Sequence, residues 1–312
     1  MKGSAWFVVI LLLPFSGCLR EEAPPPVIGE EEDEGIQAPW WPLGKWWNIT
    51  LQRGTNPVQK FDLVNFWNDT ETSHFWVGVE NRAIALDHAL HDNNPLLGRI
   101  HHGLLTPHEK GMHAHGMYTF PILAGEEFDG LMFDREWSLK AANGTKPGTL
   151  AFTGTATDGA KIKYDYDPAY MWFTFIEIKN PDGTLDMRAD VGNHGLGKHG
   201  TFYFLRGRDL YFKQNVPGTM EERFDVPGEP EEAGTIKQLA FEINGQTNGV
   251  LRIELKNPQG ATVKEHQLAA QSDRKIFEVD AVDGKWTVAY TGGGTFTGTI
   301  EVVGIVPITK SI

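Results

Sequence analysis

Short runs of alternating apolar and polar residues, separated by glycine and proline turns, constrain the fold of this chain more than any other feature. The run MWFTFIEI at residues 171–178 puts Ile176 and Ile178 on the same parity as Trp172. Side chains of a strand alternate between its two faces, so such runs indicate β-strands. The 35 glycines and 18 prolines supply many turns. We therefore expect a mainly β protein.

The first part of the body, residues 40–213, is expected to form an antiparallel β-meander or curved sheet. A His-rich insertion at 82–111 interrupts it, with a short helix from Ala83 to His91 that the following Asn-Asn-Pro would end. The expected strands are 46–52, 58–66, 73–80, 112–122, 130–141, 149–157, 160–166, 170–179, 184–191 and 201–213.

A second β unit is expected at residues 235–306. The segment 214–234 is rich in proline and glutamate and reads as a linker. After it, six short alternating runs follow one another with turn pairs between them, which is typical of a β-sandwich. Trp286 and Tyr290 fall on apolar positions of these runs and are expected in the core.

The N-terminus predicts export and membrane attachment. Residues 1–17 have a lysine, an apolar run and small residues, as in a secretory signal peptide. Cys18 follows where a lipoprotein signal places its acylated cysteine, and it is the only cysteine, so internal disulfides are excluded. Residues 18–39 are acidic and proline-rich, which indicates an extended tether. We expect a chain lipid-anchored at Cys18 on the extracytoplasmic face of the membrane, at the cell surface.

Two resemblances agree with this picture. The pattern NPQGATV…DGKWTVAYTGGGTFTGTIEV resembles jelly-roll accessory domains at the C-termini of secreted proteins. The run YTFPILAGEEF resembles a pattern of uncharacterised archaeal cell-surface lipoproteins across residues 40–213. Phe120, Pro121, Ile122 and Gly125 match that pattern, whereas Phe128 stands where tryptophan is usual. This family implies a long β-meander but carries no function or catalytic residue over to this chain.

Histidines form the most distinctive cluster of candidate ligands. Seven of the 11 lie between His88 and His115. On a strand, His113, His115 and Met117 would share one face and point away from the core, about 6.5–7 Å apart between neighbours. Two imidazoles at that spacing can bind one metal ion, and a thioether beside them favours copper, whereas carboxylates or more imidazoles favour zinc.

His88 and His91 form a second candidate pair, one helical turn apart. The alternative is that all these histidines are polar surface residues that bind no ligand. A multicopper oxidase is rejected, because such enzymes need several His-x-His pairs and a ligand cysteine.

Other sequence features are weaker. The glycine-rich segment VGNHGLGKHG offers His194 and His199 but favours a hairpin connection. Asn48, Asn68 and Asn143 begin glycosylation sequons. The tryptophans of WWPLGKWW at residues 40–47 could stack on sugar, although they are more often core residues at the start of a domain.

These features favour a binding protein over an enzyme. No nucleophile elbow, phosphate-binding loop, zinc-protease helix or dinucleotide fingerprint occurs, so no catalytic residue is assigned. A net charge of −13 without a basic patch argues against nucleic acid. We expect an extracytoplasmic lipoprotein that binds an unidentified small ligand or a metal ion, copper or zinc. The alternatives are a structural or interaction protein that contacts an envelope protein, and, third, a metal-dependent hydrolase.

Overall fold

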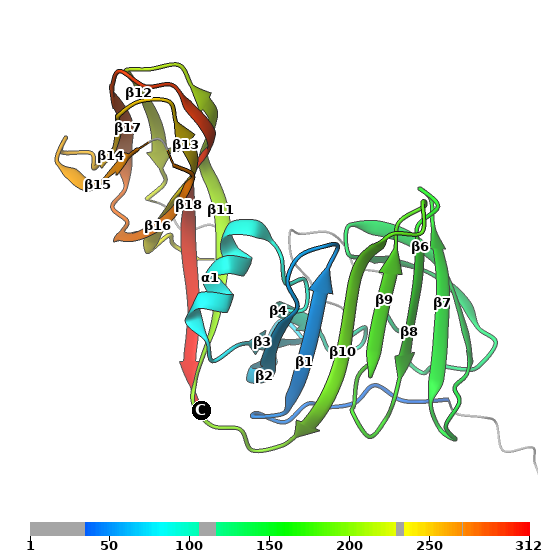
Figure 1. Ribbon diagram of the computed structural model, residues 1–312. Helices are drawn as coiled ribbons and strands as arrows, with labels where there is room; N and C mark the ends of the chain where they lie inside the picture. Colours follow the sequence, from blue (N-terminus) through cyan, green and yellow to red (C-terminus); the bar gives the residue numbers. More distant parts are fainter. Residues whose placement is uncertain (1–34, 106–116, 229–233, 270) are drawn as a thin grey trace, which may run out of the picture. The chain divides into compact units, whose positions relative to one another are not determined.

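The computed structural model describes residues 35–105, 117–228, 234–269 and 271–312. Residues 35–312 form one compact unit. As expected, the protein is mainly β, with one ten-stranded antiparallel sheet, two four-stranded sheets and one short helix in its described part (Figure 1).

The ten-stranded sheet has the order β4-β3-β2-β1-β10-β9-β8-β7-β6-β5. Strand β10 lies between β1 and β9 and so joins two meanders into one sheet. Its strands are β1 (Trp46–Arg53), β2 (Gln59–Asp69), β3 (His74–Gly78), β4 (Gly98–His101), β5 (Glu127–Met132), β6 (Arg135–Asn143), β7 (Leu150–Ala156), β8 (Lys161–Tyr166), β9 (Phe175–Lys179) and β10 (Leu185–Gly195).

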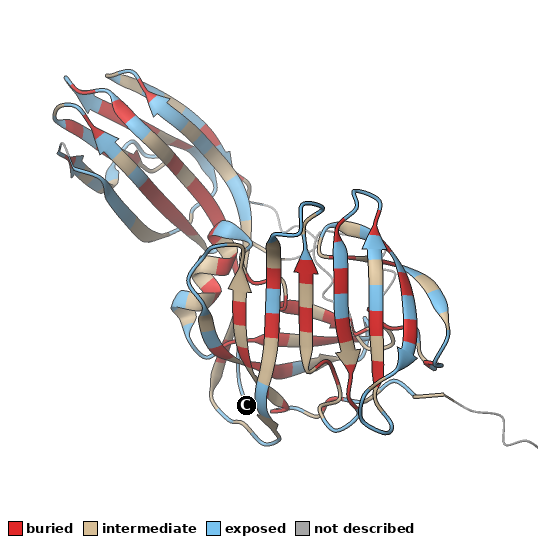
Figure 2. Ribbon diagram, turned by 45° about the vertical axis from the view of Figure 1, so that its right-hand side comes forward, coloured by how far each residue is buried: buried red, intermediate tan, exposed pale blue. Residues whose placement is uncertain are grey.

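Alternation along these strands decides which face is buried. In β6, Trp137, Leu139 and Ala141 are buried while the residues between them are exposed. The same alternation of buried and exposed positions can be followed along neighbouring strands in Figure 2. Each strand thus contributes every second side chain to a shared apolar core.

Irregular segments also contribute to that core. The polar groups of buried aromatic side chains hold these segments in place by hydrogen bonds to backbone carbonyls. The indole N–H of Trp41 donates to the carbonyl of Met171 at 2.9 Å, and the hydroxyl of Tyr118 donates to the carbonyl of Asp165 at 2.6 Å. The ring of Trp41 also stacks on Phe75, with centroids 4.7 Å apart. Buried N–H and O–H groups need such partners, so the aromatic side chains fix the coil as well as fill the space.

The second β unit of the chain, from Thr201 onward, is an eight-stranded jelly roll. Its sheets have the orders β11-β18-β13-β16 and β12-β17-β14-β15, so most hydrogen-bonded neighbours are strands that are distant in sequence. The strands are β11 (Thr201–Val216), β12 (Met220–Val226), β13 (Gln238–Thr247), β14 (Leu251–Lys256), β15 (Thr262–Leu268), β16 (Asp273–Asp280), β17 (Gly284–Gly292) and β18 (Phe296–Ser311). Trp286 and Tyr290 are buried in its core, which confirms that expectation.

Three expectations about the elements were wrong. The segment 214–234, expected as a linker, contains β12 and the end of β11. Strand β11 pairs with β18 from Thr201 to Val216, so the jelly roll begins at residue 201 and not at 235. Residues 117–122, the described part of the expected strand 112–122, form no strand beyond a single bridge between Ile122 and Ile36. Residues 130–141 form a hairpin of β5 and β6 and not one strand.

Helix α1 (Arg82–His91) lies where it was expected. The side chain of Asn81 caps its first turn by accepting from the N–H of Ala83. Asp92 ends it in the left-handed conformation, with its N–H donating to the carbonyl of His88 at 2.7 Å. No other α-helix occurs in the described ranges, and α1 is too short to cross a membrane.

Candidate functional site

Helix α1 is bound to the jelly roll at both of its ends. At its first residue, the guanidinium of Arg82 donates to Glu278 and to Gln238, each at 2.7 Å. At its last residue, Nε2 of His91 lies 3.0 Å from the carboxylate of Glu242. The nine residue-to-residue steps from Arg82 to His91 rise about 13.5 Å along the helix, and the four steps from Gln238 to Glu242 on β13 span about 13 Å. The helix and the strand therefore match in length between these two attachments.

Between its ends, α1 lies directly on strand β11. Gly207 is the position of contact, because a Cβ added there would lie only 1.8 Å from the carbonyl oxygen of Ala89. Glycine is required at this place for close backbone approach, not for an unusual backbone angle.

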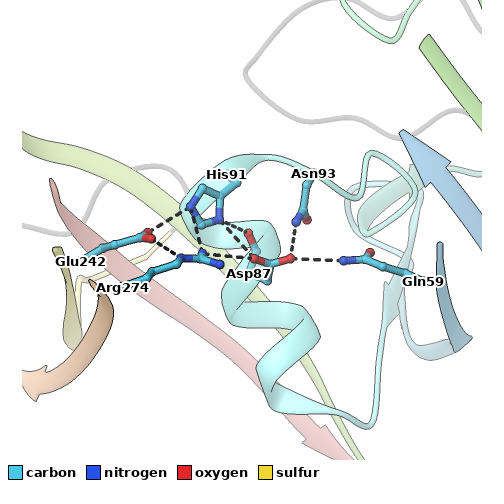
Figure 3. Close-up of polar contacts among 6 residues, drawn as sticks. All are labelled: Gln59, Asp87, His91, Asn93, Glu242 and Arg274. Carbon is cyan, nitrogen blue, oxygen red and sulfur yellow. Dashed lines mark hydrogen bonds and ion pairs between the residues drawn. The ribbon is translucent and has the colours of Figure 1, made fainter. Parts of the chain in front are cut away.

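A network of charged and amide side chains surrounds His91, and we call it the His91 network (Figure 3). Nδ1 of His91 lies 3.2 Å from a carboxylate oxygen of Asp87. Arg274 donates to Glu242 at 2.6 Å, on the oxygen that His91 does not contact. Asp87 also accepts from two amides, and the full set is Gln59, Asp87, His91, Asn93, Glu242 and Arg274.

The network holds His91 as an imidazolium ion. Hydrogen bonds to Asp87 and then to Glu242 raise the pKa of His91 to about 10. The hydrogen bond from His91 in turn lowers the pKa of Asp87. Burial alone would raise the pKa of Glu242, but hydrogen bonds from His91 and Arg274 outweigh burial and lower it. All four charged groups are therefore ionised at neutral pH.

This geometry is one of ion pairing and not of metal binding. Asp87 and Glu242 contact opposite nitrogens of the same ring, so their carboxylates cannot converge with the imidazole on one ion. More generally, no group of three or more His, Cys, Asp or Glu side chains that could hold a metal ion occurs among the residues that the structure describes.

A polar cleft of about 570 Å³ lies beside the network. The β1–β2 hairpin, the C-terminal end of α1 with the residues after it, and strand β16 form its walls. Eight of its ten lining residues have polar or charged side chains, and the lining is Leu51, Arg53, Asn56, Pro57, Gln59, Asp87, His91, Asp92, Asn93 and Arg274. Hydrogen-bond donors and acceptors from separate elements thus face one space.

The ligands predicted from sequence do not come together in the described structure. His88 is buried, with its ring 5.8 Å from that of Phe204, whereas His91 faces the jelly roll. Met117 was expected on an exposed face, but this was wrong, because its side chain is fully buried. His113 and His115 lie outside the described residues.

The adjacent pair His101 and His102 behaves as two separate residues. The ring of His101 meets His74 across two paired strands, and that of His102 meets Phe75, with centroids 5.4 and 3.9 Å apart. Nδ1 of His101 accepts from the N–H of Gly103 at 3.1 Å, which puts the proton of the neutral ring on Nε2.

The glycine-rich segment connects two sheets and does not form the expected hairpin. His199 is exposed, whereas Nδ1 of His194 lies 3.0 Å from Nζ of Lys45. Burial lowers the pKa of Lys45 to about 8. Burial, followed by the charge of Lys45, lowers the pKa of His194.

The sequons and the tryptophan group differ in accessibility. The side-chain amide nitrogen of Asn48 donates to Asp62, and that of Asn68 to the carbonyl of Trp41, whereas Asn143 is exposed. Trp41 and Trp47 are fully buried, as core residues should be, while Trp40 is exposed.

Sequence reasoning missed Glu242 and Arg274. The signal for Glu242 is a carboxylate inside the apolar run LAFEI, where every residue is buried. A buried charge needs an opposite partner, but the sequence does not say which residue supplies it.

Comparisons with known proteins add no assignment. No family model matches the chain, and no curated protein matches it. Among solved structures it is similar to an exo-β-1,3-galactanase from Phanerochaete chrysosporium, with 5% identity, a TM-score of 0.17, and 83% of this chain and 68% of that chain covered. The structure of infectious bursal disease virus Gx strain gives 10% identity and a TM-score of 0.13, with 89% and 74% covered. At these TM-scores neither likeness carries an argument about fold or function.

Proposed function

We propose that this chain is a lipid-anchored extracytoplasmic binding protein that holds a small polar solute in the polar cleft. The single observation that carries the proposal is the lining of that cleft. Arginine, carboxylate and amide groups lie together on rigid elements, fixed by the ion pairs of the His91 network.

The cleft chemistry defines the class of solute. Arg53 and Arg274 can bind a carboxylate or hydroxyl oxygens, and Asp87 and Asp92 can accept from ammonium or hydroxyl groups. Leu51 and Pro57 supply a small apolar wall. A solute with both donors and acceptors, such as an amino acid, a short peptide or a neutral sugar, is complementary to this lining, and the volume suits a molecule of that size.

Membrane attachment rests on the N-terminal sequence. The signal peptide at 1–17 and the acidic tether at 18–39 support export followed by acylation of Cys18. An anchored binding protein of this kind would collect its solute at the cell surface.

A blocking substitution tests the cleft. Asn56 lines it, and its side chain is exposed, so Asn56→Trp would fill the space while leaving the His91 network intact. Val58 is also exposed but does not line the cleft, which makes Val58→Trp the matched control.

The measurement is calorimetric titration of the protein with pools of amino acids, short peptides and neutral sugars. At least one pool should bind the wild type and Val58→Trp alike, and bind Asn56→Trp at least tenfold more weakly. No binding from any pool, or equal binding to all three proteins, would overturn the assignment of the cleft.

A further inference from the structure

Lys45 is a buried amine whose hydrogen-bond partner is an imidazole. The residue is only 2% exposed, and its Nζ lies 3.0 Å from Nδ1 of His194. In the described part of the chain no carboxylate pairs with Lys45. A lysine this deeply buried almost always faces an opposite charge. The Lys45–His194 pair is therefore an unusual feature of the fold.

The pair joins two segments that are far apart in the sequence. Lys45 immediately precedes β1, whereas His194 is the next-to-last residue of β10. Trp47 of β1 pairs with His194 across these two strands, which lie side by side in Figure 1. Nζ of Lys45 also lies 5.3 Å from the centre of the Trp47 ring. The three side chains thus share one face of the sheet.

A backbone hydrogen bond extends the same contact beyond the strands. The N–H of Lys198, in the connection from β10 to β11, donates to the carbonyl of Gly44 at 3.0 Å. The segment before β1 is fixed, because the N–H of Asn65 on β2 donates to the carbonyl of Lys45 at 2.8 Å. The connection has three glycines within residues 195–200, so it is the side that yields when the contact opens.

The state of His194 follows from the groups around it. An ammonium group only donates, so Nδ1 of His194 accepts and the ring proton is on Nε2. Burial and then the charge of Lys45 lower the pKa of His194, and the attraction of Asp167 does not reverse this. Asp167 itself accepts from the N–H of Ala169 and lies 3.7 Å from Nζ of Lys146.

The remaining neighbours of His194 leave this balance unchanged. The ring of Tyr170 packs on the imidazole, with centroids 4.1 Å apart, and keeps it beside Lys45. Lys198 and Asp62 form their ion pair beside Trp46. Trp46 and Trp47 are consecutive in β1, so that ion pair lies on the opposite face of the sheet.

We propose that Lys45 and His194 form an acid-released clasp between the segment before β1 and the connection from β10 to β11. At neutral pH the ammonium donates to the neutral imidazole, and the clasp is closed. When Nδ1 takes up a proton, the hydrogen bond loses its acceptor and two cations face each other inside the protein. The end of β10 and the connection then separate from β1 and from Gly44.

The direction of the pH dependence follows from the lowered pKa of His194. The stabilisation by the clasp is complete above the ordinary value of 6.5 and is lost as pH falls below it. The clasp is thus a contact that opens in acid surroundings, and it is separate from the polar cleft.

Nuclear magnetic resonance of the full chain measures both events, the titration of the His194 ring and the hydrogen exchange of the Lys198 amide. Exchange rates are corrected for their intrinsic dependence on pH. Protection of the Lys198 amide should fall severalfold with the same midpoint as the ring titration. The amide of Val191, which donates to the carbonyl of Thr174 within the sheet, should stay protected. Unchanged protection of Lys198 while His194 takes up its proton would overturn the clasp.

Two substitutions each remove one of the charges. His194→Gln keeps an oxygen that can accept from Lys45 but takes up no proton, so the Lys198 amide should stay protected in acid. In Lys45→Met the cation is gone, and the midpoint of His194 should move to higher pH. His199→Gln is the matched control and should open as the wild type does, because His199 is exposed. An acid opening that persists in His194→Gln, or an unchanged His194 midpoint in Lys45→Met, would overturn the proposal.

Discussion

His91 on helix α1 and Glu242 on strand β13 form an ion pair, with Nε2 3.0 Å from the carboxylate oxygen. The side chain of Glu242 is almost completely buried. Its charge is therefore tolerated only because His91 and Arg274 contact its two oxygens. The pair joins a helix inserted between strands of the ten-stranded sheet to the jelly roll.

Replacing His91 by glutamine should destabilise the protein. The change removes the cation between Asp87 and Glu242, but Arg274 still neutralises Glu242. We therefore expect a loss of about 1–2 kcal/mol in the free energy of unfolding, less than for a fully buried pair. Urea unfolding measures it, with His199→Gln as the control because His199 is exposed. Equal stability of the two variants would contradict a structural role for the network.

The same pair predicts how stability depends on pH. The pKa of His91 is raised from 6.5 to about 10, so its contribution is complete below pH 6.5 and is lost as pH rises through 10. The pKa values of Asp87 and Glu242 are lowered from 3.8 and 4.5, so their contributions are present above those values and are lost at more acid pH.

The difference in unfolding free energy between wild type and His91→Gln should consequently be largest between about pH 4.5 and 6.5 and shrink towards pH 10. Urea unfolding of both proteins at a series of pH values measures this. A difference that grows with pH would show that the imidazolium is not the stabilising form.

Gly207→Ala should weaken the docking of α1. The new methyl group cannot share space with the carbonyl of Ala89, so the helix or β11 must move, at a cost of about 1–3 kcal/mol. Gly293→Ala is the control, because a Cβ there meets nothing within 4 Å. Hydrogen exchange of the α1 amides should accelerate in Gly207→Ala alone. Unchanged exchange would mean that the packing tolerates the methyl group.

The copper or zinc site at His113 and His115 stays a prediction. Wild-type protein purified without a histidine tag should carry about one equivalent of metal, and His113→Ala/His115→Ala should lose it. Metal content by mass spectrometry and the thermal shift on adding copper or zinc measure this, with His199→Ala as the control. Substoichiometric metal in the wild type with no thermal shift would remove the hypothesis.

Cys18→Ser should release the protein from the membrane. Without the thiol no acyl chain can be attached, and we expect the chain to move from the membrane fraction to the soluble fraction after cleavage of the signal peptide. Fractionation with metabolic labelling of the lipid measures both effects. A wild-type chain that incorporates no lipid would contradict the anchor.

The strands were predictable where alternation is regular and turns use ordinary turn residues. The hairpin between β5 and β6 was missed because Phe133 and Asp134 form its turn, with φ values of 54° and 57°. Such turns usually carry asparagine or glycine, so the sequence lacked the expected signal. Strand β12 was missed because prolines and glutamates on both sides of it read as a linker.

The candidate site was harder to predict than the fold. The position of His91 on a helix was correct, but its partners lie on β13 and β16, more than 150 residues further along the chain. Local pattern says nothing about which distant strand meets a helix face. The helical spacing alone paired His91 with His88. In the structure the ring of His88 lies in the core, whereas the ring of His91 lies in the His91 network.

The long pairing of β11 with β18 has an evolutionary consequence. Phe202 and Leu205 of β11 belong to the first core, as do Val303 and Ile305 of β18, while the other ends of both strands belong to the jelly-roll core. A recombination breakpoint within residues 214–234 would separate the two strands and leave both cores incomplete. Because the same two strands contribute to both cores, the jelly roll cannot be exchanged without removing part of the first core.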